Sequence, residues 1–138
     1  MITETNVAVR YPDCDPMGIV HHAVYPVWYE IARMDYFEAL GFGYRAMHEK
    51  GIDPPMVDLH VMYKAPVRYP GTVTVRTRAT FYAPKKLRLH YETWYEGALV
   101  NACDSFHIWT GPDGKSLDME AALPEVYEKI KAAAEAES

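Results

Sequence analysis

The spacing of apolar residues divides the chain into a helical first third and a strand-rich remainder. Over residues 24–40, apolar side chains recur at intervals of three and four, the period of an α-helix. Pro26 suits the first turn of this helix, and Gly41 suits the position just past its end. Because the apolar positions spread over much of the circumference, we expect other structure to wrap around the helix.

After a weaker helical segment over residues 44–50, apolar and polar residues alternate with a period of two. Four such segments span residues 58–69, 73–81, 87–95 and 99–110, and short turns containing proline or glycine separate them. Short turns favour antiparallel pairing, because parallel strands need a long crossover. With a short strand over 5–11 and a closing helix over 123–136, the pattern predicts an α+β fold: a long antiparallel β-sheet wrapped around one central helix.

Length and charge narrow the class of protein. The 138 residues fit one domain spanning 1–138, and the net charge of −5 argues against nucleic acid as a partner. No apolar run approaches the roughly 18 residues of a membrane span, and residues 1–10 show no signal-peptide pattern. Two cysteines, Cys14 and Cys103, are too few for a disulfide framework. We therefore expect a cytoplasmic protein, with Cys103 in the core.

The densest cluster of chemically reactive residue types lies just before the long helix. Starting at Asp13, the chain carries the pattern Asp-x-Asp-x-x-Gly-x-Val-x-His-x-x-Tyr and then runs into the helix. This segment resembles the hotdog-fold 4-hydroxybenzoyl-CoA thioesterase family and the related acyl-CoA thioesterases associated with the Tol–Pal system. The predicted strand order agrees with that family, so the resemblance covers roughly residues 4–112.

The resemblance implies a hotdog fold and the hydrolysis of an acyl-CoA thioester to a free acid and CoA. It places the catalytic carboxylate on Asp15 and the helix N-terminal amide that polarises the thioester carbonyl at about His21 to Ala23. It also implies that His22 orients substrate or water, and that Tyr25 contacts the substrate. Gly18 permits a tight backbone bend or a close approach of the substrate, because glycine has no side chain. Elementary chemistry agrees, because a loop carboxylate can act as general base or as nucleophile, and free N–H groups at a helix start can stabilise an oxyanion. Both roles of Asp15 stay open.

Other polar residues receive supporting or structural roles. Lys85, Lys86 and Arg88 follow a turn on an otherwise acidic chain, and such a cluster suits the phosphates of CoA. We expect Asp13 to shape the loop and Glu30 to be solvated or paired with Arg33. The adjacent residues His21 and His22 point in different directions and have no clustered partner, so we expect no metal site and no cofactor.

Two other functions compete with the thioesterase. A hotdog hydratase or dehydratase also acts on acyl thioesters, but the chain lacks the His-Phe-Pro-rich signature of those enzymes. A non-catalytic acyl-CoA-binding module would have no need of Asp15. Because long strand edges must be paired or protected, and because tyrosine and tryptophan are abundant, we expect a homodimer or homotetramer.

Overall fold

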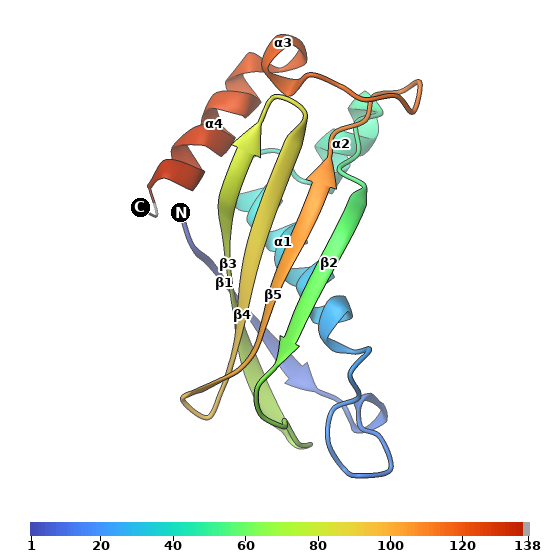
Figure 1. Cartoon of the computed structure of the whole chain (residues 1–138), viewed down its shortest axis with the longest axis vertical. Coiled ribbons are helices and arrows are strands. Elements are labelled where there is room, and N and C mark those ends of the chain that lie inside the picture. The colour runs from blue at the N-terminus through green and yellow to red at the C-terminus, as the bar shows by residue number, and fades with distance from the viewer. Residues whose placement is uncertain (137–138) are drawn as a thin grey trace.

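A five-stranded antiparallel β-sheet supports the other elements of the fold (Figure 1). The computed structural model describes residues 1–136, and the strands follow the order β1-β3-β4-β5-β2 across the sheet. Their bounds are β1 Thr3–Val9, β2 Met56–Tyr63, β3 Gly71–Ala83, β4 Lys86–Tyr95 and β5 Ala98–Ile108. All pairings are antiparallel, as the short turns predicted.

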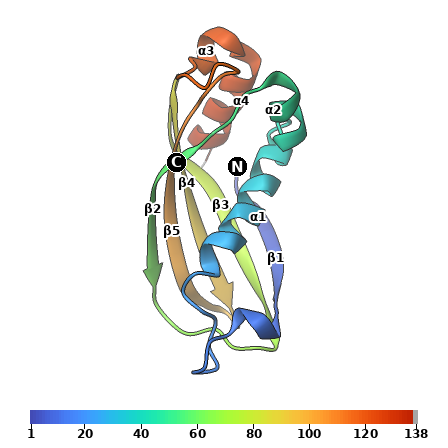
Figure 2. The ribbon, with the colours of Figure 1, turned by 90° about the vertical axis from the view of Figure 1, so that its right-hand side faces the viewer.

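One long helix lies across the inner face of this sheet (Figure 2). This is α1, Tyr25–Ala39, which begins with a proline in its first turn and packs mainly over β1 and β3. The remaining helical elements are shorter than α1: η1 Tyr11–Asp13, α2 Tyr44–Lys50, α3 Met119–Ala122 and α4 Pro124–Glu135. A long antiparallel sheet curved around one helix is the hotdog architecture, so the predicted fold class is confirmed.

The core forms where alternate strand residues meet the inner face of α1. Leu87, Leu89 and Tyr91 of β4 are buried there, and Tyr29 of α1 packs its ring 4.8 Å from that of Tyr91. The Tyr29 hydroxyl lies 2.8 Å from the Thr93 hydroxyl, so a polar group inside the core is satisfied. The period of two along β4 therefore sets which residues reach the helix.

In the single chain, the expectation that other structure wraps around α1 holds for only one face of the helix. Tyr29, Ala32, Tyr36 and Phe37 are fully buried, but a stripe on the opposite side of the helix is open to solvent. That stripe consists of Val27, Ile31 and Met34, which are 57%, 40% and 43% exposed. The reason is geometric: one sheet can cover only one face of a helix.

The strand predicted over 58–69 is also too long. β2 ends at Tyr63, and the amides of both Lys64 and Ala65 donate to the Val100 carbonyl, which interrupts the ladder. Pro66 then follows, and proline has no N–H with which to continue pairing. The strands predicted over 5–11 and 99–110 stop at Val9 and Ile108, and the short helix α3 was not predicted.

The two sides of the sheet are protected differently. Strand β1 pairs with the first half of β3, and α4 also packs against β3. The hydroxyl of Tyr82, on β3, donates to Glu135, on α4, at 2.7 Å. On the other side, β2 pairs with β5 along one edge, and in the described residues 1–136 no further strand pairs with it. Almost every residue of β2 is exposed, including Val57 at 59% and Leu59 at 36%.

Candidate functional site

The loop between η1 and α1 is held by backbone hydrogen bonds rather than by regular structure. Asp15 N donates to the Ile19 carbonyl at 2.9 Å, and Val20 N donates to the Val67 carbonyl at 2.8 Å, which ties the loop to the segment after β2. Asp13 is buried, and its carboxylate accepts from the Arg10 backbone and guanidinium at 2.8 and 2.9 Å. The loop-shaping role predicted for Asp13 is thus confirmed.

Gly18 provides the bend on which this loop turns. Its φ is +78°, a conformation that residues with a side chain adopt at a cost, and its amide donates to the Asp15 carbonyl at 2.9 Å. An added Cβ would lie 3.5 Å from the Arg68 guanidinium, an ordinary contact, so the constraint on Gly18 is conformational rather than steric. Gly18 itself does not line the cavity described below.

Asp15 offers one free carboxylate oxygen. Oδ1 accepts a hydrogen bond from the Met17 amide at 2.8 Å, which fixes the orientation of the carboxylate. Within the part of the chain that the structure describes, Oδ2 has no hydrogen-bond partner. The side chain is partly exposed, so Oδ2 is open to a water molecule or a substrate.

The backbone turn leading into α1 also leaves one amide free. His21 N donates to the Asp13 carbonyl, Ala23 N to the His21 ring nitrogen, and Val24 N to the His21 carbonyl, at 2.9 to 3.0 Å. Among the described residues, the amide of His22 has no such acceptor. Helix α1 itself starts at Tyr25, so the predicted helix start at His21 to Ala23 is a turn that precedes the helix.

Asp15, His22 and Tyr25 line one cavity of about 430 Å³. Three of the predicted site residues therefore line the same cavity. Seven positions separate Asp15 from His22 along the chain, and three separate His22 from Tyr25. Tyr25 packs edge to face with Tyr63, and the Tyr63 hydroxyl donates to the His22 carbonyl at 2.6 Å. The side chain of His22 lies against the His21 ring, with centroids 4.1 Å apart.

The structure adds cavity residues that sequence reasoning missed. Tyr63, the last residue of β2, and Lys64, which follows it, line the cavity, and Lys64 is a cation in a site that contains a carboxylate. The remaining lining residues are mostly apolar, and they are Met17, Ile19, Val20, Ala65 and Pro66. Nothing local to 63–66 marks these residues as functional, because their position in the site comes from the pairing of β2 with β5.

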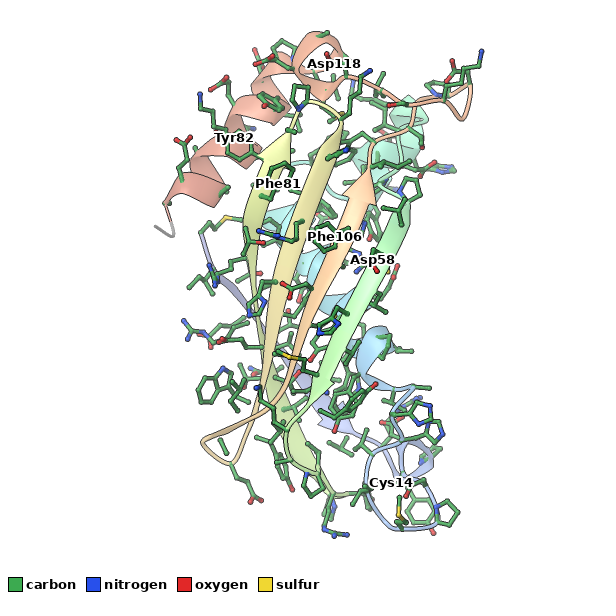
Figure 3. The ribbon with its side chains drawn as sticks, viewed as in Figure 1. Cys14, Asp58, Phe81, Tyr82, Phe106 and Asp118 are labelled. Atoms are coloured by element: carbon green, nitrogen blue, oxygen red, sulfur yellow. The ribbon has the colours of Figure 1, made fainter. Side chains whose placement is uncertain are left out.

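The predicted phosphate cluster lies far from this cavity within one chain. The β3–β4 turn that carries Lys85 and Lys86 is at one end of the sheet, whereas the loop around Cys14 is at the other (Figures 1 and 3). Lys85 and Lys86 are exposed. Arg88 lies on the outer face, bonded to the Thr80 hydroxyl at 2.8 Å and placed over the Phe106 ring.

Two alternative kinds of chemistry find little support in the geometry. Burial raises the pKa of the Cys103 thiol to about 12, so this residue is a core side chain rather than a nucleophile. Both cysteines are free. Over residues 1–136, no group of three or more histidine, cysteine, aspartate or glutamate side chains is placed to hold a metal ion.

No described helix has the length and apolarity needed to cross a membrane.

A curved antiparallel sheet around one helix, with a loop carboxylate and a free backbone amide in the turn before that helix, defines a protein of the hotdog class. Residues 9–133 match the Thioesterase-like superfamily, and the chain belongs to that family. The predicted class, a thioester hydrolase, is therefore confirmed at the level of the family.

Individual relatives agree with this assignment. The Bacillus subtilis (strain 168) protein YneP, provisionally named an acyl-CoA thioesterase, is 35% identical over 94% of this chain and 98% of its own length. A DHNA-CoA thioesterase from Staphylococcus aureus is 32% identical, with a TM-score of 0.90 over 99% of this chain and 95% of that one. The fold also matches a 4-hydroxybenzoyl-CoA thioesterase mutant complexed with 4-hydroxybenzoyl-CoA, with a TM-score of 0.81 over 91% and 98% of the chains at 21% identity.

Proposed function

We propose that this protein hydrolyses acyl-CoA thioesters in the cavity lined by Asp15, His22 and Tyr25. The observation that supports the proposal most directly is that two residues lining one cavity each carry a free group: Asp15 its Oδ2 and His22 its backbone amide. A thioester carbonyl between them can meet a carboxylate on one side and a hydrogen-bond donor at its oxygen. Named relatives that act on CoA thioesters support CoA as the carrier.

The proposed chemistry uses the two groups in different roles. The His22 N–H donates to the carbonyl oxygen and stabilises the negative charge that develops there as the carbon is attacked. Asp15 either removes a proton from the attacking water or attacks the carbon itself, forming a mixed anhydride that water then cleaves. In both routes the C–S bond breaks, CoA leaves as thiolate, and the acid leaves as carboxylate. The Met17 amide holds the Asp15 carboxylate in place.

Release of free thiol from a panel of acyl-CoA esters tests this proposal. The panel spans short, long and aromatic acyl groups, and thiol release is followed with a thiol-reactive dye. Hydrolysis of at least one ester, with saturation kinetics, is the expected result. Saturable binding of every ester without thiol release would instead indicate an acyl-CoA-binding module. Addition or loss of water at the acyl chain would indicate a hydratase or dehydratase.

We also propose that the active protein is a homo-oligomer, a homodimer or homotetramer. The exposed edge of β2 and the apolar stripe of Val27, Ile31 and Met34 are surfaces that a monomer rarely leaves uncovered. Sedimentation at micromolar concentration should give at least twice the chain mass of 15.8 kDa. A single species at the chain mass would contradict this proposal.

We further propose a cytoplasmic location, on the basis of two free cysteines.

Lys85 and Lys86 are proposed to bind the CoA phosphates of a site in another subunit, because they lie too far along the sheet to serve their own chain's cavity. Lys85→Glu with Lys86→Glu should raise KM about tenfold or more for CoA esters, by charge reversal beside the phosphates, and little for the matching pantetheine esters. Steady-state kinetics with both ester types measures the difference. Equal effects on both would contradict the phosphate role.

A mixed oligomer tests the contribution from another subunit directly. Subunits carrying the two lysine changes are combined with subunits carrying Asp15→Asn. If the lysines act across subunits, one site in the mixed oligomer has both an intact Asp15 and intact lysines, so the low KM should return. If they act within one chain, no site is intact and the KM stays high.

A further inference from the structure

The chain just after β2 is fastened to the loop before α1 at two points. The Tyr63 hydroxyl donates to the His22 carbonyl at 2.6 Å. The Val20 amide donates to the Val67 carbonyl at 2.8 Å. Lys64 lies between these two anchors along the chain, so the structure holds it beside the loop that carries the carboxylate and the free amide.

The proposed active-site cavity has a buried floor and an exposed rim. Val20 and Tyr25 line it as buried residues. Met17, Tyr63 and Lys64 line it as exposed residues. An acyl group directed toward the floor leaves the long, polar CoA arm over the rim, where water solvates it. The sulfur that joins the acyl group to the arm then lies on the side of Lys64.

Lys64 brings to this cavity a positive charge that no other polar side chain lining it supplies. In the described residues, its ammonium has no ion-pair or hydrogen-bond partner. Burial raises the pKa of Tyr25 to about 12, so that hydroxyl stays neutral, and the Tyr63 hydroxyl already donates to a carbonyl. No described carboxylate lies within ion-pair distance of the His22 ring to favour its charged form.

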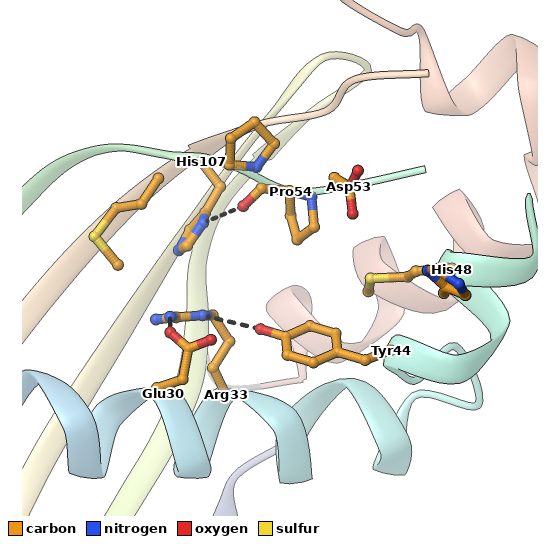
Figure 4. A pocket seen from close by; sticks show the side chains of 10 residues that line it. Glu30, Arg33, Tyr44, His48, Asp53, Pro54 and His107 are labelled. Atoms are coloured by element: carbon orange, nitrogen blue, oxygen red, sulfur yellow. Dashed lines mark hydrogen bonds and ion pairs between the residues drawn. The ribbon is translucent and has the colours of Figure 1, made fainter. Parts of the chain in front are cut away.

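The buried cation of α1, Arg33, is by contrast already engaged (Figure 4). It lines a separate cavity of about 460 Å³, together with Glu30, Tyr44 and His107. Its guanidinium pairs with Glu30, which confirms the expected ion pair, and donates to the Tyr44 hydroxyl at 3.3 Å. No described residue lines both this cavity and the active-site cavity. Lys64 is therefore the cation placed to act on a bound thioester.

Breaking the thioester bond creates a negative charge that the groups assigned so far do not stabilise. The electron pair of the C–S bond moves to sulfur, in a site that already holds the Asp15 carboxylate. An alkyl thiol has a pKa of about 8.5, so the sulfur leaves as an anion and needs a counter-charge more than a proton. An ammonium beside the sulfur stabilises that anion, and more strongly where bound substrate excludes water.

On this basis, and resting on the function proposed above, we propose that Lys64 is a catalytic residue that stabilises the departing thiolate. Its ammonium lies beside the thioester sulfur and keeps its own protons. The thiolate takes up a proton from solvent after it leaves, and the proton that Asp15 takes from water returns to solvent as the acid is released. Asp15 thus acts on the attacking atom, the His22 amide on the carbonyl oxygen and Lys64 on the sulfur.

Two thioesters that share an acyl group and differ in the leaving thiol test this inference. The acyl group is one that the wild type hydrolyses as its CoA ester. One ester is that of pantetheine, an alkyl thiol without phosphates, and the other is that of thiophenol, whose anion is a weaker base. Lys64→Met should lower kcat/KM about 10- to 100-fold for the pantetheine ester and about threefold or less for the phenyl ester, which needs less stabilisation. Lys64→Arg keeps the charge and should recover most of the loss.

The matched control is Lys115→Met, an exposed lysine outside the cavity, which should change neither rate. An equal loss on both esters, or no loss on either, would overturn the assignment of Lys64 to the sulfur. A loss with the CoA ester alone would overturn it too, because it would show that Lys64 contacts a phosphate. Failure of the wild type to hydrolyse any acyl-CoA ester would count against the proposed function instead.

Ionisation of bound CoA gives a second readout that does not depend on turnover. The thiol of CoA bound beside an ammonium should have its pKa lowered by about 1 relative to free CoA, because a nearby cation favours the anion. A pH titration of the thiolate absorbance, with CoA saturated by protein, measures this pKa. Lys64→Met should return it to the value of free CoA, and Lys64→Arg should keep it low. The same pKa in the wild type and in Lys64→Met would place the sulfur away from Lys64 and overturn the inference.

Discussion

Replacing Asp15 by asparagine should lower kcat for acyl-CoA hydrolysis by about 10² to 10⁴, the usual contribution of a positioned base or nucleophile. Asparagine keeps the size of the side chain and can still accept from the Met17 amide, but it loses the charge and the basicity of the free oxygen. KM should change much less, since the cavity walls stay in place. Thermal unfolding should be nearly unchanged, because the Asp15 side chain is partly exposed and lies outside the core.

Asp13→Asn is the matched control, two positions away in the same loop. Asp13 is buried and paired with Arg10, so this change should reduce stability by about 1 to 3 kcal/mol, the cost of a broken charged hydrogen bond, and have a smaller effect on kcat. If Asp13→Asn is inactive while Asp15→Asn stays active, the catalytic carboxylate is Asp13 and not Asp15. Full activity in both variants would refute the proposed mechanism.

The long helix shows what periodicity can predict. Residues 24–40 were expected to be helical, and α1 spans Tyr25–Ala39 with Val24 and Leu40 as its caps. The agreement is close because three signals coincide: the apolar spacing, Pro26 in the first turn and Gly41 just beyond the end, where φ is +81°. Periodicity failed for β2 because alternation continued through Ala65 and Val67, although Pro66 cannot pair.

The loop motif was enough to predict Asp15, His22 and Tyr25 as neighbours in one cavity, because residues close in sequence around a helix start can lie close in space. Tyr63 and Lys64 could not be predicted in the same way. They reach the cavity through the pairing of β2 with β5, a long-range contact that no local pattern records. The burial of Arg33 was missed for a related reason: an arginine within a helix is expected at the surface, yet Arg33 lies on the buried face and donates to the Tyr91 hydroxyl at 2.9 Å.

His107 should make stability depend on pH, because it is buried and its ring bonds to the Ser105 hydroxyl at 2.7 Å and to the Pro54 carbonyl at 2.8 Å. Burial lowers the pKa of His107 to about 4 from its ordinary value of 6.5, because the charged imidazole is poorly solvated there. Between these two values the unfolded chain binds a proton at His107 that the folded chain does not. The free energy of unfolding therefore falls as pH falls from 6.5 toward 4, and the loss at pH 4 should be about 3 kcal/mol. Protonation would also turn Nε2 into a donor facing the Ser105 hydroxyl, which now donates to it.

Urea denaturation of the wild type and of His107→Gln, at one fixed protein concentration between pH 7.5 and 4, measures this contribution. Glutamine should lower stability at neutral pH, because it cannot make both hydrogen bonds of the ring with the same geometry. It should also remove the titration, so the stability difference between wild type and variant should shrink by about 3 kcal/mol on going to pH 4. Carboxylates elsewhere contribute equally to both proteins and cancel. The exposed His48→Gln is the control and should keep the wild-type pH dependence. Parallel curves for wild type and His107→Gln would show that His107 is not the group that titrates.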